Sequence, residues 1–171
     1  MEFTQGVRFD SLGLSPEIMR AIAHRNLEVS TPVQAGCIPP MMAWQDVIAK
    51  APTGTGKTFA YGIPIVEHID PEDETVQAVI LAPTRELAIQ ITGELRDIAA
   101  FKPGVRSVCL YGGQPIGKQI DTLKKRPQIV VATPGRLSDH MKRRTVKVDT
   151  VQTVVLDEAD RMLDMGFIHD V

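Results

Sequence analysis

Short apolar runs that alternate with helical patterns are the feature that most restricts how this chain can fold. The runs are rich in β-branched residues and almost continuously apolar, as parallel strands covered on both faces should be. They are residues 47–49, 78–82, 129–132 and 154–156, with a fifth candidate at 106–111. Helical patterns occupy residues 58–68, 86–100 and 136–142. The alternation predicts right-handed βαβ units and an α/β fold, with an open, mostly parallel sheet flanked by helices on both faces.

Length, charge and cysteine usage restrict the class of protein further. A chain of 171 residues fits one domain, and its net charge of -2 means that any nucleic-acid site must be a local surface. No run is long enough to span a membrane, and residues 1–10 lack the apolar core of a signal peptide. Cys37 and Cys109 lie among apolar neighbours without metal-ligand spacing, which indicates buried free thiols and a cytoplasmic location.

Two segments outside the strand–helix alternation also have clear signals. Ser15 followed by Pro16 predicts a helix start, because serine caps a helix and proline suits the first helical position. Leu14, Ile18 and Ile22 then form an apolar stripe that should dock on the rest of the domain. The acidic residues 70–74 indicate a solvated surface loop.

A phosphate-binding loop is predicted where the first apolar run meets the first long helix. Residues 51–58 read Ala-Pro-Thr-Gly-Thr-Gly-Lys-Thr. Gly54 and Gly56 allow the backbone of residues 53–56 to turn several N–H groups toward one anion, and the helix N-terminus adds partial positive charge. Lys57 would neutralise the β and γ phosphates, and Thr58 would offer its hydroxyl to Mg²⁺. A glycine-rich turn that only caps a helix would explain the glycines but not the Lys-Thr pair.

Acidic residues follow the last apolar run, where a metal-dependent phosphate reaction requires them. Asp157 comes directly after the predicted strand 154–156 and is placed to hold the metal, and Glu158 would orient and polarise the attacking water. An acidic first turn of a helix is the alternative, since carboxylates favour helix N-termini. The phosphate loop makes that alternative the weaker interpretation.

Together these residues resemble the DEAD-box RNA helicase family, whose name is spelled by residues 157–160. The resemblance covers residues 9–167 and implies a RecA-like P-loop domain that binds ATP and Mg²⁺. Residues 31–34 are similar to the family's Q motif, in which the glutamine, here Gln34, reads both hydrogen-bonding positions of the adenine edge. Phe9 stands where the family has the aromatic that packs over the base. The chain departs from the family by having Asn26, Leu27 and Ser30 where glycine, an aromatic and proline are usual.

The resemblance also implies three segments that hold an RNA backbone. They begin after successive predicted strands and are Pro83-Thr84-Arg85-Glu86-Leu87, Gly112-Gly113 and Thr133-Pro134-Gly135-Arg136. Hydroxyl and guanidinium groups suit phosphate oxygens, which position a nucleic acid without reading its bases. Taken without the resemblance, the first and third segments are plausible helix starts and the glycine pair a plausible turn.

The family comparison predicts how the chain works and what it lacks. We expect an ATP-dependent RNA helicase that remodels single-stranded or duplex RNA, with residues 1–34 as the Q-motif region and residues 35–171 as the P-loop core. The family's second RecA-like domain, with its arginine fingers, would lie beyond Val171, so we expect a monomeric N-terminal fragment. Because an arginine finger contributes about 10³–10⁵ in rate, the chain alone should turn ATP over very slowly.

Three other functions remain compatible with parts of the sequence. A helicase or translocase of another family would keep the phosphate loop and the acidic pair but not the arrangement around Gln34. A small-molecule kinase would need an acceptor pocket and a lid, for which the sequence has no signal. A module that binds nucleotide only as a structural ligand would not need Glu158.

Overall fold

The computed structural model describes residues 5–52 and 56–171 of the chain and divides it into two compact units. The first unit comprises residues 5–69 together with 94–103, and the second comprises residues 70–93 together with 104–171. Helix α4 (Arg85–Ile98) contributes residues to both units.

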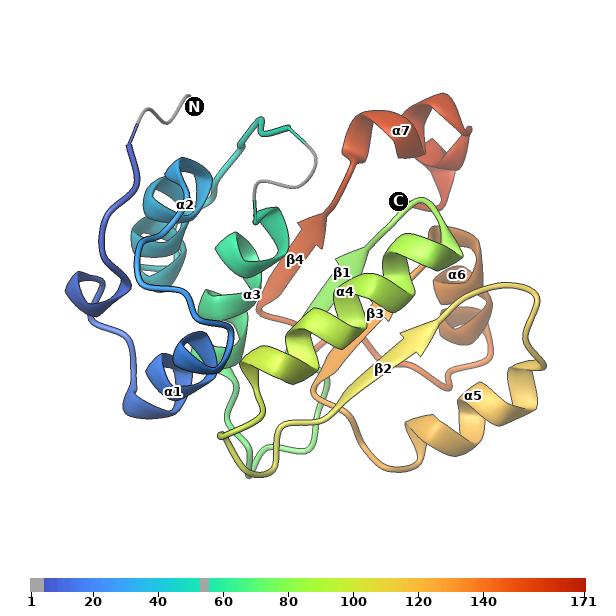
Figure 1. Ribbon diagram of the computed structural model, residues 1–171. Coiled ribbons are helices and arrows are strands. Elements are labelled where there is room, and N and C mark those ends of the chain that lie inside the picture. The colour runs from blue at the N-terminus through green and yellow to red at the C-terminus, as the bar shows by residue number, and fades with distance from the viewer. Residues whose placement is uncertain (1–4, 53–55) are drawn as a thin grey trace. The chain divides into compact units, whose positions relative to one another are not determined.

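A four-stranded parallel sheet forms the centre of the second unit. Its strands are β1 (Ala78–Leu81), β2 (Ser107–Leu110), β3 (Ile129–Ala132) and β4 (Thr153–Leu156), in the order β2-β3-β1-β4 (Figure 1). Ala78 lies opposite Ile129 on one side and Thr153 on the other, so the strands run in register. Four of the five predicted strands are therefore confirmed, and so is the parallel α/β fold.

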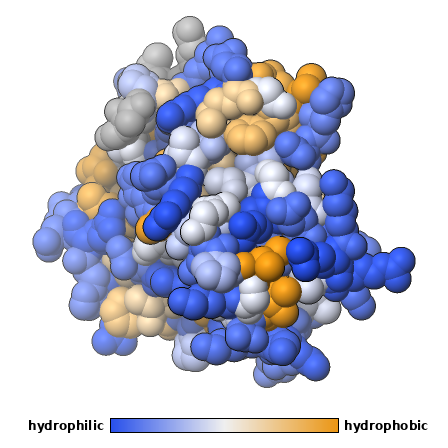
Figure 2. All heavy atoms as spheres, turned by 90° about the vertical axis from the view of Figure 1, so that its right-hand side faces the viewer, coloured by the Kyte–Doolittle hydropathy of each residue, from blue (hydrophilic) through white to orange (hydrophobic). Residues whose placement is uncertain are grey.

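The helices of the second unit follow the strands as the alternation requires. They are α5 (Ile116–Leu123), α6 (Pro134–Lys142) and α7 (Ala159–Asp164), with the short turn η2 (Phe167–His169) after α7. One face of the sheet packs against side chains from these helices and the loops beside them. The buried members of this cluster are Val79, Leu81, Val108, Leu110, Val130, Ala132, Leu137, Val146 and Met162. Figure 2 shows that the outer side bearing these helices is mainly hydrophilic, as expected for helices that bury only their inner faces.

β1 and β3 are buried along their whole length, whereas β4 is not. Every residue of β1 and β3 is buried, which confirms strands covered on both faces. Val154 and Leu156 in β4 keep exposed fractions of 61% and 44%. The prediction of a buried strand at 154–156 was therefore wrong in this respect. β4 pairs with β1 alone among the described strands, so it lies at an edge of the sheet.

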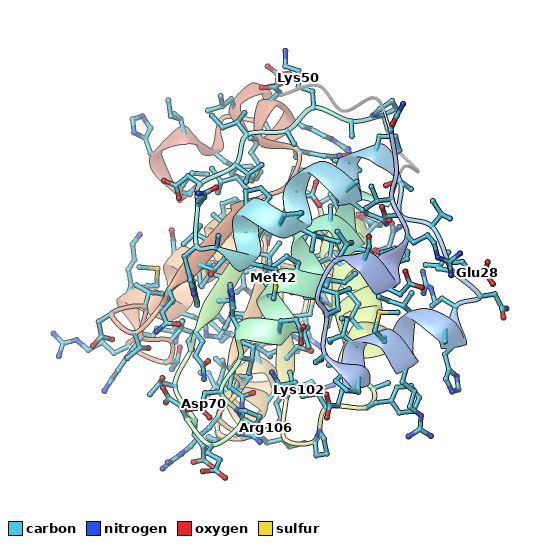
Figure 3. The ribbon with its side chains drawn as sticks, turned by 90° about the vertical axis from the view of Figure 1, so that its left-hand side faces the viewer. Glu28, Met42, Lys50, Asp70, Lys102 and Arg106 are labelled. Carbon is cyan, nitrogen blue, oxygen red and sulfur yellow. The ribbon has the colours of Figure 1, made fainter. Side chains whose placement is uncertain are left out.

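The first unit consists of helices. It contains η1 (Phe9–Ser11), α1 (Pro16–His24), α2 (Pro32–Met42) and α3 (Lys57–His68). The start of α1 is as predicted, with the Ser15 side chain accepting a hydrogen bond from the N–H of Ile18 at 3.3 Å. Ile18 and Ile22 are buried. The C-terminal end of α3 is closed by Lys102, whose Nζ donates to three backbone carbonyls, at 2.7 Å to Val66, 3.1 Å to Glu67 and 2.8 Å to Ile69 (Figure 3).

The predicted strand at residues 47–49 is absent from the described part of the chain, where this segment is irregular. Ile48 is 85% exposed. Val47 and Ala51 instead pack against Val33, Cys37 and Ala60, a cluster on helices α2 and α3. A three-residue apolar run does not by itself specify a strand, because a strand forms only by hydrogen bonding to a neighbouring strand. Within this run, Val47 packs on the helices, whereas Ile48 and Ala49 are exposed.

Smaller predictions about burial were met unevenly. Cys37 and Cys109 are both free thiols, but only Cys37 is buried, and Cys109 is partly exposed on β2. The acidic residues 70–74 form turns with mostly exposed side chains, as predicted. Among the residues that the structure describes, no helix is long and apolar enough to cross a membrane.

Candidate functional site

Four of the predicted segments leave the same edge of the sheet in the second unit. Backbone hydrogen bonds just beyond the strands fix their common level: Thr133 N–H donates to Leu110 at 3.0 Å, and Ala82 N–H to Ala132 at 3.0 Å. Asp157 N–H donates to Leu81 at 2.9 Å. Because all strands are parallel, their carboxyl ends share one edge, where ligands bind in open α/β sheets. The edge therefore carries, in spatial order, residues 112–113, 133–136, 83–87 and 157–160.

The segment after β1 combines a helix cap with an exposed cation. Thr84 Oγ1 accepts the N–H of Leu87 at 3.2 Å and so caps α4. Pro83 is buried, whereas Arg85 is exposed. The Arg85 guanidinium lies over the ring of Tyr111, 4.9 Å from its centroid. Arg85 thus presents N–H donors at the edge while an aromatic from the next segment supports it.

The glycine pair after β2 forms a turn that requires at least one glycine. Gly113 has φ +87°, a conformation that side-chain-bearing residues rarely adopt. A methyl group built at Gly113 would lie 3.8 Å from a terminal nitrogen of Arg85. Both glycines are exposed, so their backbone is open to a ligand.

The segment after β3 begins α6, and its arginine is largely occupied by the protein. Pro134 takes the first helical position of α6. Thr133 stands at the cap position, but among the described residues its side chain makes no capping hydrogen bond to the helix. Gly135 follows in the first turn, partly exposed. Arg136 donates one terminal N–H group to the carbonyl of Gln114 at 2.8 Å and to Gln119 Oε1 at 3.2 Å. Its side chain is only 15% exposed, so most of Arg136 is packed within the protein, where its hydrogen bonds hold Gln114 and Gln119 in place.

The acidic segment after β4 places two carboxylates in different surroundings. Asp157 is buried at the strand end, with 7% exposure. Glu158 has φ +52° and precedes α7, and its carboxylate accepts a hydrogen bond from Arg161 at 3.3 Å. A non-glycine residue in this conformation costs about 1–3 kcal/mol, and such strain is concentrated at functional sites.

The end of the phosphate loop lies in the first unit. Thr53, Gly54 and Thr55 lie outside the described residues. Gly56 has φ +78° and caps α3, which begins at Lys57 and continues through Thr58. Glycine is required at position 56 for two reasons: the positive φ disfavours other residues, and an added methyl group would lie 2.3 Å from Gln34 Nε2. Glycine, lysine and threonine therefore stand at the start of a helix, as the motif requires.

Gln34 and Phe9 are both buried in the first unit. Gln34 is 4% exposed, and its Nε2 donates to the carbonyl of Gly56 at 3.2 Å. Its Oε1 accepts the N–H of Thr31 at 2.8 Å, completing a capping box at the start of α2. Phe9 is 1% exposed, so a base could stack on its ring only after the ring is uncovered. Ser30 accepts the N–H of Val7 at 3.0 Å and donates to its carbonyl at 2.7 Å, which ties residues 7–9 to residues 28–30.

A buried polar network behind the edge was not predicted from the sequence. Gln119 is 2% exposed, and its Nε2 donates to the carbonyl of Tyr111 at 2.8 Å and to Gln114 Oε1 at 2.9 Å. Its Oε1 accepts a hydrogen bond from Arg136 and lies within hydrogen-bond distance, 2.8 Å, of His140 Nε2. One amide thus joins the turn after β2 to helix α6. A single glutamine in a polar helical stretch leaves no sequence signal.

Comparisons with known proteins identify the family of the chain. A sequence profile described as DEAD/DEAH box helicase matches residues 31–171. The chain is 54% identical over 165 residues to the "DEAD-box ATP-dependent RNA helicase CshA" of Bacillus licheniformis, covering 96% of this chain and 34% of that protein. It is 54% identical over 163 residues to the protein of the same name in Geobacillus kaustophilus, covering 95% and 35%.

A solved structure agrees as well. The crystal structure of a DEAD box protein from the hyperthermophile Methanococcus jannaschii has a TM-score of 0.90 and 40% identity, covering 95% of this chain and 44% of that one. Fold and site thus define an α/β domain of the RecA-like class. The chain belongs to the DEAD/DEAH box helicase family, and it spans about a third of the length of the curated relatives above.

Proposed function

We propose that this chain supplies the ATP-binding half of an ATP-dependent RNA helicase, together with part of its RNA-backbone surface. The observation that carries the proposal is the convergence of residues 83–87, 112–113, 133–136 and 157–160 on one edge of a parallel sheet. Membership in the DEAD/DEAH box helicase family supports assigning nucleotide and RNA binding to this edge. In the intact protein, ATP and RNA would close this domain against a second RecA-like domain and open a short duplex locally.

Residues 53–58 are proposed to hold the phosphates of ATP. The left-handed backbone of Gly56 and the N-terminal N–H groups of α3 suit an anion. Mg²⁺ prefers oxygen ligands, so we propose Thr58 and Asp157 as its protein ligands. Held by these two residues, Mg²⁺ would supply positive charge at the transferred phosphate. Lys57 would add a positive charge to the phosphates, and Glu158 would orient the attacking water.

The hydrogen bonds of Gln34 support a role in reading adenine. A glutamine amide has two N–H donors and an oxygen with two lone pairs. Gly56 and Thr31 use one of each, so one donor and one acceptor remain after the contacts made within residues 5–52 and 56–171. Adenine offers a donor and an acceptor along one edge, which matches this remainder, whereas guanine offers two acceptors there. Phe9 is proposed to cover the base once its ring is uncovered.

The RNA surface is proposed to consist of Thr84, Arg85, the glycine pair at 112–113 and the start of α6. Contacts of this kind hold phosphates without reading bases, so we expect no sequence preference. Single-stranded and duplex RNA would both bind through their backbones. We further propose that the protein acts in the cytoplasm and that this chain is monomeric.

Calorimetric titration of ADP and then GDP into the chain, with Mg²⁺ present, tests the nucleotide proposal. ADP should bind about 5- to 150-fold more tightly, because a misplaced acceptor against Gln34 costs about 1–3 kcal/mol. Gln34→Ala should remove the difference, and Gln45→Ala, at an exposed position, should keep it. Equal binding of both nucleotides to the unaltered chain would contradict the role of Gln34.

ATP turnover by the chain alone tests the division of labour between domains. We expect very slow hydrolysis with or without RNA, because arginine fingers supplied by another domain contribute about 10³–10⁵ in rate. Brisk RNA-stimulated turnover would show that residues 1–171 contain everything the reaction needs.

A further inference from the structure

His140 is a buried histidine that the proposed chemistry does not use. It lies on α6, one helical turn after Arg136, and is fully inaccessible to solvent. Its Nε2 lies 2.8 Å from Gln119 Oε1, and its Nδ1 lies 2.8 Å from Thr145 Oγ1. Since Gln119 Oε1 can only accept, His140 Nε2 carries the proton, and Nδ1 of the neutral ring faces the Thr145 hydroxyl, which also donates to the His140 carbonyl at 3.1 Å.

The orientation of the Gln119 amide decides whether the network holds together. In the observed orientation, its Nε2 faces two acceptors, the carbonyl of Tyr111 and Gln114 Oε1, and its Oε1 faces two donors, on Arg136 and His140. A rotation by 180° would set the Gln119 oxygen against the Tyr111 carbonyl and the Gln119 NH₂ group against the Arg136 guanidinium, and neither partner can exchange its role as acceptor or donor. Buried polar groups that lose their partners are costly, so the network permits one orientation.

We propose that His140 is a positioning residue for the RNA-backbone surface: by donating to Gln119 Oε1, it fixes the Gln119 amide that holds the turn at residues 111–114 beside the start of α6. This inference rests on the proposed function of that surface. Arg136 also donates to Gln119 Oε1, but it is the partner nearer to solvent. If Arg136 turns toward a phosphate, His140 is the remaining donor that the structure gives this oxygen among the described residues.

Charges around the ring are consistent with a neutral, fixed donor. Burial lowers the pKa of His140, the nearby cations Arg136 and Arg143 lower it further, and Asp139 opposes them. A neutral ring with its proton on Nε2 donates to Gln119 and leaves Nδ1 facing the Thr145 hydroxyl without a second proton. The histidine therefore has one tautomer and one role above its pKa.

Three variants separate positioning from packing. His140→Leu keeps an apolar side chain of similar size without the donor, and His140→Gln restores an N–H near the same place. Val146→Ala is the matched control, because Val146 lies in the adjacent core but outside the polar network. All three should lose some stability, and ADP affinity should stay within twofold of the unaltered chain in each.

RNA affinity and backbone amide signals are the informative measurements. Binding of a fluorescently labelled single-stranded RNA at low salt should weaken about tenfold in His140→Leu. This is the effect expected when one hydrogen bond from the displaced turn to a charged RNA phosphate is lost. His140→Gln should recover most of this loss, and Val146→Ala should bind as the unaltered chain does. In NMR spectra without RNA, the amide signals of Gly112 and Gly113 should move in His140→Leu and stay in place in Val146→Ala.

The outcomes distinguish failure of this inference from failure of the proposed function. If His140→Leu leaves the glycine amide signals unmoved, or shifts them no more than Val146→Ala does, the positioning role is wrong. Arg85→Ala tests the surface itself, since Arg85 is exposed and outside the Gln119 contacts. If Arg85→Ala leaves RNA binding unchanged while His140→Leu moves the glycine signals, the network positions the turn but the surface is not the RNA site.

Discussion

Replacement of Gly56 by alanine should disturb the nucleotide site through two separate effects. Gly56 has φ +78°, and a methyl group there would lie 2.3 Å from Gln34 Nε2 and 3.2 Å from its amide carbon. Gln34 has little room to retreat, because it is 4% exposed and its Oε1 is held by Thr31 N–H at 2.8 Å. The methyl group would therefore displace a side chain that caps α2.

The expected loss of stability follows from these two effects. An L-residue in the left-handed conformation costs about 1–2 kcal/mol. Loss of the hydrogen bond from Gln34 to the Gly56 carbonyl adds about 1 kcal/mol. Alanine also reduces the entropy of the unfolded chain, which returns about 0.4–1 kcal/mol. The free energy of unfolding should fall by about 2 kcal/mol in total.

Urea denaturation and ADP titration of Gly56→Ala measure the two consequences. Gly93→Ala is the matched control, because Gly93 is an exposed position inside α4 with no atom within 4 Å of the added methyl group. That variant should gain up to about 1 kcal/mol from helix propensity. ADP affinity should fall roughly tenfold, or about 1.4 kcal/mol, in Gly56→Ala and stay unchanged in Gly93→Ala.

A double-mutant cycle isolates the collision from the backbone strain. In a Gln34→Ala background the obstructing amide is absent, so Gly56→Ala should cost only the strain of its positive φ. The coupling between the two sites should then be about 1 kcal/mol. If Gly56→Ala unfolds at the same urea concentration as the unaltered chain and binds ADP equally well, the described geometry at residue 56 is wrong.

Three further predictions concern pH, a helix end and a thiol. Because burial lowers the pKa of His140 below its ordinary 6.5, its contribution to stability should be complete above pH 6.5 and be lost as pH falls toward the folded pKa; denaturation of His140→Gln should lack this pH-dependent component. Lys102→Met should lower the free energy of unfolding by about 2–3 kcal/mol, since three carbonyls at the end of α3 lose a charged donor, whereas Lys124→Met, at a position 75% exposed, should change it by less than about 0.5 kcal/mol. Burial raises the pKa of the Cys37 thiol, so thiol titration at pH 8 should label Cys109 first and Cys37 only with unfolding, and equal rates would contradict the packing of α2.

The strands that could be predicted are those whose residues carry the evidence themselves. Residues 78–82 and 129–132 are apolar throughout and include several β-branched residues, and both form central strands buried on each face. The cap of α1 was equally local, since Ser15 and Pro16 contain the whole signal. The strand at 47–49 failed because pairing depends on a neighbour that the segment cannot specify.

Side-chain partners distant in sequence were the part that could not be predicted. Gln34 was selected for its resemblance to a motif, but its bond to the Gly56 carbonyl joins residues 22 apart in the chain. Gln119 and His140 are 21 residues apart, and neither stands in a recognisable pattern. Hydrogen bonds between buried side chains depend on how the helices pack against one another. The hydrophobic periodicity of a helix predicts which of its faces is buried, but it does not predict the polar contacts of that face.

The strand-end segments show why a helix-start interpretation and a ligand-binding interpretation of the same residues do not exclude each other. In a parallel sheet followed by helices, each helix begins at the edge where ligands bind, so its cap and its first N–H groups already face that edge. Thr84 caps α4, and Pro134 begins α6, as the simpler interpretation predicted. Exposure is what separates the two arginines beside them: Arg85 is open to solvent on the Tyr111 ring, whereas Arg136 is 15% exposed and bonded to Gln114 and Gln119. A phosphate should therefore meet Arg85 directly, and Arg136 should act first by keeping the edge in shape.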